Sequence, residues 1–169
     1  MKHEGEKSVS EIMMDMIAQA RGNRHDICHF LKVYGYAKTI AELEKVPPEV
    51  QKTVEIAAIV HDIACPLCRE KYGNTNGKLQ EKESGPLVDA FLEDSGLPEE
   101  IRRRVSYLVA RHHTIEGVDS LDWQILLEAD YLVNADESGY PPENVRNAEK
   151  VLFRTDAGRL LLKAIYQQP

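Results

Sequence analysis

Apolar residues recur at the spacing of an α-helix along almost the whole chain, and no stretch shows the alternation of a half-buried strand. Ser8 and Glu11 have the spacing of a capping box, which predicts the start of the first helix. Residues 65–81, which follow a long apolar segment and are rich in Gly, Asn and charge, predict the longest irregular connection. The expected helices span residues 9–20, 26–45, 48–64, 84–94, 98–113, 120–135, 142–151 and 156–167. The pattern therefore predicts a single compact all-α domain over residues 1–169.

Composition places the chain among soluble globular proteins. With 169 residues, of which 43% are hydrophobic and 29% charged, it can bury a substantial core without disulfides. The net charge of −7 argues against a general nucleic-acid binder, which usually has a basic surface. No apolar run has the length of a membrane span, and residues 1–11 are too polar for a secretory signal. An odd number of cysteines, three, then favours reduced thiols, so we expect a cytoplasmic protein without a membrane partner.

The pair His61-Asp62 stands near the end of an otherwise apolar stretch, residues 54–60. Burying a histidine beside a carboxylate is costly unless other groups replace the lost water contacts. Neighbouring residues of a regular helix do not share a face, so both side chains can meet one partner only if that partner lies beside the helix end. A metal ion at this end is one solution, and a private salt bridge or hydrogen bond for each group is the other.

Three more polar residues are predicted to face the interior from separate helices. His29 shares a helix face with Val33, Ala37 and Ile40, and His112 continues the line of Ile101, Val105 and Leu108. In the helix over residues 120–135, the expected polar arc consists of Gln124, Glu128 and Tyr131, and Asp130 falls outside it. Each residue alone fits an ordinary core position with a satisfied polar group. With His61-Asp62 also directed inward, two imidazoles and two carboxylates form a nitrogen and oxygen set that suits Mn, Fe, Co, Ni or Zn.

The order of these residues, H…HD…D on successive helices, resembles the HD superfamily of metal-dependent phosphohydrolases. The resemblance rests on the segments 25–33, 57–64 and 126–130, and it spans about residues 24–135. It implies that His29, His61, Asp62 and Asp130 hold one divalent ion: Mn, Fe, Co, Ni, Zn or Mg. It also implies hydrolysis of a phosphate ester, often of a nucleotide, so the expected partner is a small phosphorylated substrate.

The resemblance also implies catalytic roles. His112-His113 match a later histidine pair of the family, and with Asp62 they are the expected catalytic residues: a carboxylate to orient water, and histidine to stabilise charge or donate a proton. Ala64 replaces a glycine that is common after the family's His-Asp-Ile. Two-metal members carry a further histidine where this chain has residues 81–85, so a second ion would need Glu83 as an oxygen ligand.

The basic residues of the expected loop suit either of two roles. Lys71, Lys78 and Lys82, together with Arg69, would attract a phosphate beside the metal, or they are simply solvated loop charges. We treat the three lysines as candidate substrate-binding residues. The Cys65-x-x-Cys68 spacing has no second pair and no βαβ context, which favours incidental thiols at the rim of the pocket.

Two other functions compete with hydrolysis. A di-iron oxygenase would need a complete set of ligands for two metals, and a non-catalytic regulatory module would bind nucleotide or metal without turnover. The substrate's identity does not follow from periodicity or motif, since fold does not dictate function. The methionine cluster at residues 13–16 suits core packing or an interface, which leaves a homodimer open.

Overall fold

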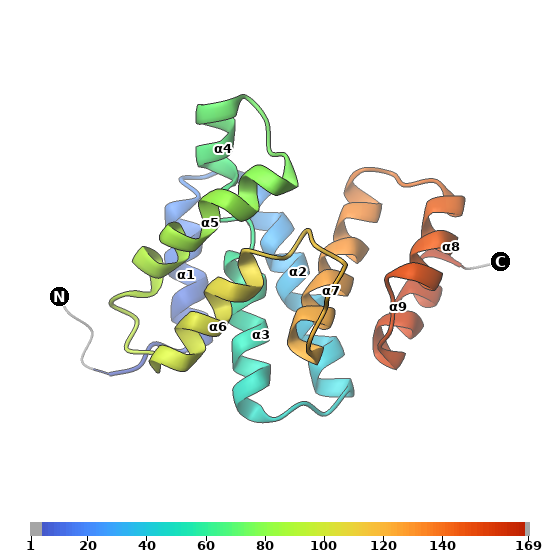
Figure 1. Cartoon of the computed structure of the whole chain (residues 1–169), viewed down its shortest axis with the longest axis horizontal. Helices are drawn as coiled ribbons and strands as arrows, with labels where there is room; N and C mark the ends of the chain where they lie inside the picture. Colours follow the sequence, from blue (N-terminus) through green and yellow to red (C-terminus); the bar gives the residue numbers. More distant parts are fainter. Residues whose placement is uncertain (1–4, 168–169) are drawn as a thin grey trace.

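Nine helices make up the part of the chain that the computed structural model describes, residues 5–167, and no strand occurs in that part (Figure 1). They are α1 (Val9–Gln19), α2 (Arg24–Leu43), α3 (Pro48–Val60), α4 (Cys65–Tyr72), α5 (Gly77–Leu92), α6 (Glu99–Val109), α7 (Leu121–Glu137), α8 (Pro142–Val151) and α9 (Asp156–Tyr166). The predicted all-α domain is confirmed. Within residues 5–167, no helix has the combination of length and apolar character that a membrane crossing requires.

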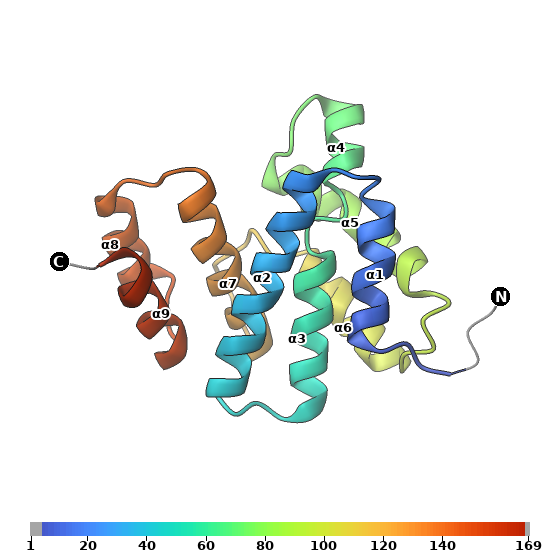
Figure 2. The same cartoon turned by 180° about the vertical axis from the view of Figure 1, so that it is seen from behind.

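Helix α3 is the centre of the core. It packs on α1, α2, α6 and α7, and Figure 2 shows it between α1 and α2. Every residue from 53 to 60 is buried, which explains why this stretch is apolar on all sides rather than on one stripe. Helix α2 packs on both α3 and α7, so α2, the C-terminal end of α3 and α7 are held in one fixed arrangement.

The first helix begins as predicted. The Ser8 hydroxyl accepts a hydrogen bond from the backbone N–H of Glu11, and the Glu11 carboxylate accepts one from the N–H of Ser8 at 2.8 Å. This reciprocal cap satisfies two of the donors that a helix start leaves unpaired. Ile12, Met13 and Met16 are buried against the core, which accounts for most of the methionine cluster by packing.

The predicted long connection over residues 65–81 is wrong. Helix α3 ends at Val60, a short turn follows, and α4 occupies Cys65–Tyr72. Pro66 lies in the first turn of α4, where its missing N–H would have no helical partner, so it starts a helix here. Gly73 ends α4 with φ of +69°, a conformation that favours glycine, and α5 then begins at Gly77 rather than near residue 84.

The expected polar arc on α7 is also wrong, because Gln124 and Glu128 are buried. The Glu128 carboxylate accepts hydrogen bonds from the backbone N–H of Arg154 at 2.7 Å and of Thr155 at 3.0 Å, and from the Gln124 amide at 2.6 Å. A Cβ at Gly158 would lie 1.9 Å from a Glu128 oxygen, so only glycine fits there. Glu128 therefore holds the start of α9 against α7. The face of α7 that was expected to be polar packs on α9 instead of facing solvent.

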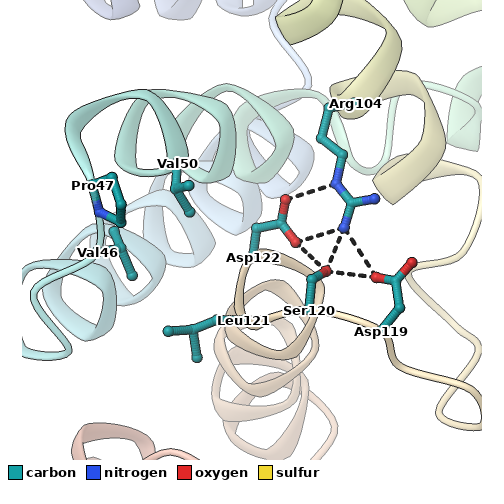
Figure 3. A pocket seen from close by; sticks show the side chains of 8 residues that line it. All are labelled: Val46, Pro47, Val50, Arg104, Asp119, Ser120, Leu121 and Asp122. Carbon is teal, nitrogen blue, oxygen red and sulfur yellow. Dashed lines mark hydrogen bonds and ion pairs between the residues drawn. The ribbon is translucent and has the colours of Figure 1, made fainter.

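Arg104 ties α6 to the start of α7 (Figure 3). Its guanidinium donates two hydrogen bonds of 2.8 Å to Asp122, one of 3.1 Å to Asp119, and another to the Ser120 hydroxyl. The network borders a hollow of about 470 Å³ whose other wall is apolar and includes Val50. Arg104 thus anchors the connection between α6 and α7, which carries both later histidines.

Candidate metal centre

The candidate ligands come from two separate helices and from one turn. His29 lies on α2 and Asp130 on α7, and both are buried. His61 and Asp62 lie in the turn after Val60, where α3 has ended. The sequence predicted that His61 and Asp62 can meet one partner only beside the end of a helix, and this turn lies there. Outside a regular helix, two consecutive side chains can reach the same point.

The donor atoms of these four residues meet at close range. His29 Nε2 lies 3.1 Å from His61 Nε2, 3.2 Å from Asp62 Oδ2 and 3.3 Å from Asp130 Oδ1. His61 Nε2 lies 3.5 Å from Asp62 Oδ2 and 3.4 Å from Asp130 Oδ1. Ligand atoms about 2.0–2.2 Å from one ion are about 2.8–3.1 Å from one another in octahedral sites and about 3.3–3.6 Å in tetrahedral sites. The spacing is therefore that of ligands around a single divalent ion.

The hydrogen bonds of the ring nitrogens orient the histidines for metal binding. Nδ1 of His29 donates to the Glu137 carboxylate at 2.8 Å, and Nδ1 of His61 donates to the Ala58 carbonyl at 2.7 Å. His112 Nδ1 likewise donates to the carbonyl of Val109 at 2.7 Å. A carbonyl only accepts, so the proton of the neutral ring is on Nδ1 and the Nε2 lone pair is free. All three Nε2 atoms face the same region of the interior.

Two buried atoms at this point have no hydrogen-bond partner among the described residues: Asp130 Oδ1 and His112 Nε2. An unpaired buried acceptor costs about 1–3 kcal/mol. When each ring carries its proton on Nδ1 alone, the Nε2 atoms that face Asp130 Oδ1 are themselves acceptors and cannot satisfy it. A cation would satisfy them, so the residues present fit a metal ion.

Electrostatics support the same conclusion. Burial lowers the pKa of His61, but the carboxylates of Asp62 and Asp130 outweigh it and raise this pKa to about 9. Burial raises the pKa of Asp130, but His29 and His61 hold it well below the usual range of a carboxyl group. The carboxylates therefore remain ionised, and without an ion the site holds a proton on His61 in place of the metal.

The segment that carries these residues matches a known family. The family model described as HD domain matches residues 26–135, which is more than half of the chain. This chain belongs to the HD domain family. Proteins of this superfamily are generally metal-dependent hydrolases, and HD domains bind divalent metals. The resemblance found in the sequence is confirmed.

A solved structure shares the fold of this chain. The chain is similar to a predicted HD superfamily hydrolase from an uncultured Thermotogales bacterium, with a TM-score of 0.64 and 24% sequence identity. The match covers 94% of this chain and 83% of that chain. No curated protein matches this chain.

A second group of possible ligands adjoins the first in this HD domain. Asp62, His112 and His113 each offer a donor atom within 4.8 Å of the others, and His112 Nε2 lies 3.5 Å from Asp62 Oδ1. Asp62 thus presents one oxygen to each group. Burial and the neighbouring His112 lower the pKa of His113 to about 4, so its ring is neutral near pH 7. Glu83 does not join either group, because it pairs with Lys71 and Tyr72.

The candidate metal centre of the HD domain borders a cleft of about 360 Å³, and the candidate lysines do not line this cleft. Lys71 pairs with Glu83 at 2.8 Å, Lys78 pairs with Glu81 at 3.1 Å, and Lys82 is exposed on α5. Their separation from the pocket follows from α4 and α5, since charges expected on a flexible loop are fixed on helices instead. Of the arginine and lysine residues that the structure describes, only Arg69 lines the cleft.

Sequence reasoning missed Glu137, which shapes this pocket, and named Arg69 only beside the lysines as a possible phosphate contact. Glu137 fixes His29, and it lies seven residues after Asp130, so helical spacing places both on one face of α7. That spacing was the available signal. Arg69 donates two hydrogen bonds, of 2.7 and 2.6 Å, to the Asp26 carboxylate at the start of α2. Cys65 also lines the pocket, as expected, whereas Cys68 does not line it and is fully buried.

Proposed function

We propose that this HD-domain protein is a metal-dependent phosphohydrolase that acts on a small phosphorylated metabolite. The observation that carries the proposal is the convergence of His29, His61, Asp62 and Asp130, whose facing atoms have the spacing of ligands around one ion. We assign these four residues as its ligands. A divalent ion held by these residues would supply a Lewis acid for a phosphoryl oxygen and would lower the pKa of bound water.

The residues around the ion then have distinct tasks. Asp62 has one oxygen toward the first group and the other toward His112, which places it to orient an attacking water. His113 lines the cleft and is neutral near pH 7, so it can accept a hydrogen bond from that water. His112 stabilises charge that develops beside Asp62.

Arg69 is the phosphate-binding residue in this proposal. It lines the cleft, whereas the three lysines do not, and its planar guanidinium suits a phosphate. Its two hydrogen bonds to Asp26 hold it at the mouth of the cleft before substrate arrives.

The test combines metal analysis with a screen for phosphate release. We expect protein purified without chelator to contain about one Mn, Fe, Co, Ni or Zn per chain, and to release phosphate from nucleotides or sugar phosphates. Asp62→Ala should lose both the metal and the activity, while Asp89→Ala, an exposed carboxylate on α5, should keep both. Metal-dependent turnover that survives in Asp62→Ala would refute the assignment.

The number of ions separates this function from its competitors. Two irons per chain in anaerobically purified protein would favour a di-iron oxygenase, in which Asp62, His112 and His113 hold the second ion. Tight nucleotide binding with no turnover in the presence of any of the candidate metals would favour a regulatory module instead.

A further inference from the structure

The ring of His113 forms no hydrogen bond within residues 5–167. In this it differs from the rings of His29, His61 and His112, each of which donates from Nδ1 to a fixed acceptor. His113 lines the cleft, and its ring contacts that of His112 at a centroid distance of 4.0 Å. The position of His113 in the cleft must therefore come from its backbone and from packing.

The backbone of His113 is held by Glu81, which lies on α5. Oε1 of Glu81 accepts a hydrogen bond of 3.1 Å from the backbone N–H of His113 and one of 2.8 Å from the Thr114 hydroxyl. The other oxygen, Oε2, pairs with the ammonium of Lys78 at 3.1 Å. Elsewhere in this turn an N–H bonds to a carbonyl just before it in the chain, as that of Thr114 does to Arg111 at 2.9 Å. The peptide of His113 is thus fixed by a side chain from another helix.

The ring of His113 packs on the same helix. A Cβ at Gly77 would lie 2.7 Å from Cγ of His113 and 2.9 Å from Cδ2, so the ring rests against the bare backbone of Gly77. Gly77 stands four residues before Glu81, which places both on one face of α5. Helix α5 packs beside α6, which ends shortly before His113 (Figure 1). Helix α5 therefore sets both the backbone and the ring of His113.

The Glu81 carboxylate is engaged by this turn and is not directed at an ion. Burial raises the pKa of Glu81, but the hydrogen bonds from its donors hold that pKa below its usual range, so the group is charged near pH 7. Hydrogen bonds to a charged acceptor are stronger than those between neutral groups. Among the residues that the structure describes, Glu81 belongs to neither group of possible metal ligands.

We propose that Glu81 is a positioning residue, which holds His113 where its ring accepts a hydrogen bond from the attacking water. The proposal rests on the phosphohydrolase function, in which Asp62 orients the same water. Asp62 and His113 offer atoms within 4.8 Å of each other, so one water can contact both. A misplacement of about 1 Å at such a point can cost about a hundredfold in rate. Glu81→Ala should therefore lower kcat about tenfold to a hundredfold and leave KM within about twofold, because Arg69 is untouched.

The experiment follows turnover of p-nitrophenyl phosphate by Mn²⁺-loaded protein. Glu81→Gln keeps an oxygen that accepts both hydrogen bonds of the turn, and its kcat should stay within about threefold of the wild type. Asp89→Ala, which removes an exposed carboxylate from the same helix, is the matched control and should leave kcat unchanged. Wild-type kcat in Glu81→Ala would overturn the proposal. Loss of one of two bound Mn²⁺ ions in that variant would make Glu81 a metal ligand and would overturn it as well.

A double-mutant cycle with His113→Ala separates positioning from a general loss of structure. If Glu81 acts through His113, then Glu81→Ala should cost less than about twofold in kcat once the ring has been removed. An equal loss with and without the His113 ring would show that Glu81 acts on the fold as a whole, and the proposal would be wrong.

Hydrogen exchange separates failure of this proposal from failure of the enzymatic function. The amide proton of His113 should exchange at least about tenfold faster in Glu81→Ala than in the wild type or Asp89→Ala, which NMR measures without any substrate. If the wild type cleaves no ester, the proposed function fails, while faster exchange still supports the role of Glu81 in holding His113. Unchanged exchange would overturn that role even in an active hydrolase.

Discussion

Replacing Glu137 with alanine tests how the metal centre is oriented. The Glu137 carboxylate accepts the Nδ1 proton of His29 at 2.8 Å and also pairs with Lys32 at 3.0 Å. Burial raises the pKa of Glu137, but Lys32 and His29 hold it below its usual range, so the carboxylate is charged. In Glu137→Ala the His29 ring loses the bond that selects its tautomer and fixes its angle, while all four proposed ligands remain.

The expected loss can be bounded in two ways. Removal of the group that orients a metal-binding histidine typically costs 10–100-fold in metal affinity, which corresponds to about 1.4–2.7 kcal/mol. Independently, the change leaves the Nδ1 proton of a buried histidine without its partner, which costs about 1–3 kcal/mol. The two ranges agree, so we expect Mn or Zn affinity to fall between tenfold and a hundredfold.

Competition with a chelating dye at fixed pH measures this affinity without reference to any substrate. Glu137→Gln should stay within about threefold of the wild type, because the amide oxygen still accepts the Nδ1 proton. Glu149→Ala, which removes a carboxylate that pairs with Lys163 on α9, is the control and should bind metal normally. Wild-type affinity in Glu137→Ala would show that the hydrogen bond does not orient His29, and would refute the reasoning.

Two further changes give sharp outcomes. In Gly77→Ala the new Cβ would lie 2.7 Å from Cγ of His113, so we expect the ring to shift and kcat/KM to fall about tenfold. In the control Gly35→Ala, the new Cβ has open space within a helix, and we expect Tm to rise by about 2–4 °C. Unimpaired turnover in Gly77→Ala would show that the position of His113 is unimportant. For metal-free protein we expect Tm to fall as pH rises from about 6.5 to about 9. The pKa of His61 is 6.5 in the unfolded chain and about 9 in the folded protein, so protonation of His61 stabilises the fold fully below pH 6.5, and this stabilisation is lost as the pH rises to about 9. Thermal unfolding in chelator checks this, and a Tm that increases with pH there would contradict it.

The helical period was sufficient to place three of the candidate ligands. His29 and His112 each continue an apolar stripe, Asp130 falls outside the polar arc that was expected on its helix, and all three are buried in the structure. The period works here because each of these residues faces the same core as its apolar neighbours. His61 and Asp62 could be placed only conditionally, since their convergence depends on where α3 ends.

The environment of other residues could not be predicted, because it depends on contacts with other helices. The periodicity of a single helix does not show these contacts. Glu128 lies on a face of α7 that looks solvated until α9 covers it. Lys71 and Lys78 were expected on a loop, but the segment is helical and pairs them with Glu83 and Glu81. A proline can start a helix or end one, and only the neighbouring contacts decide which.

The buried carboxylate of Glu128 has a consequence for any attempt to shorten this protein. The segment that matches the family ends at residue 135, which suggests a minimal version without α8 and α9. Such a truncation would strip Glu128 of the backbone donors at residues 154 and 155 and leave a charge facing newly bared apolar surface, at a cost of several kcal/mol. Because Glu128 stands two residues before Asp130, the damage would reach the metal centre directly. The last two helices therefore act as an integral brace for the ligand on α7, and a fragment that stops at the family boundary should misfold or fail to retain its ion.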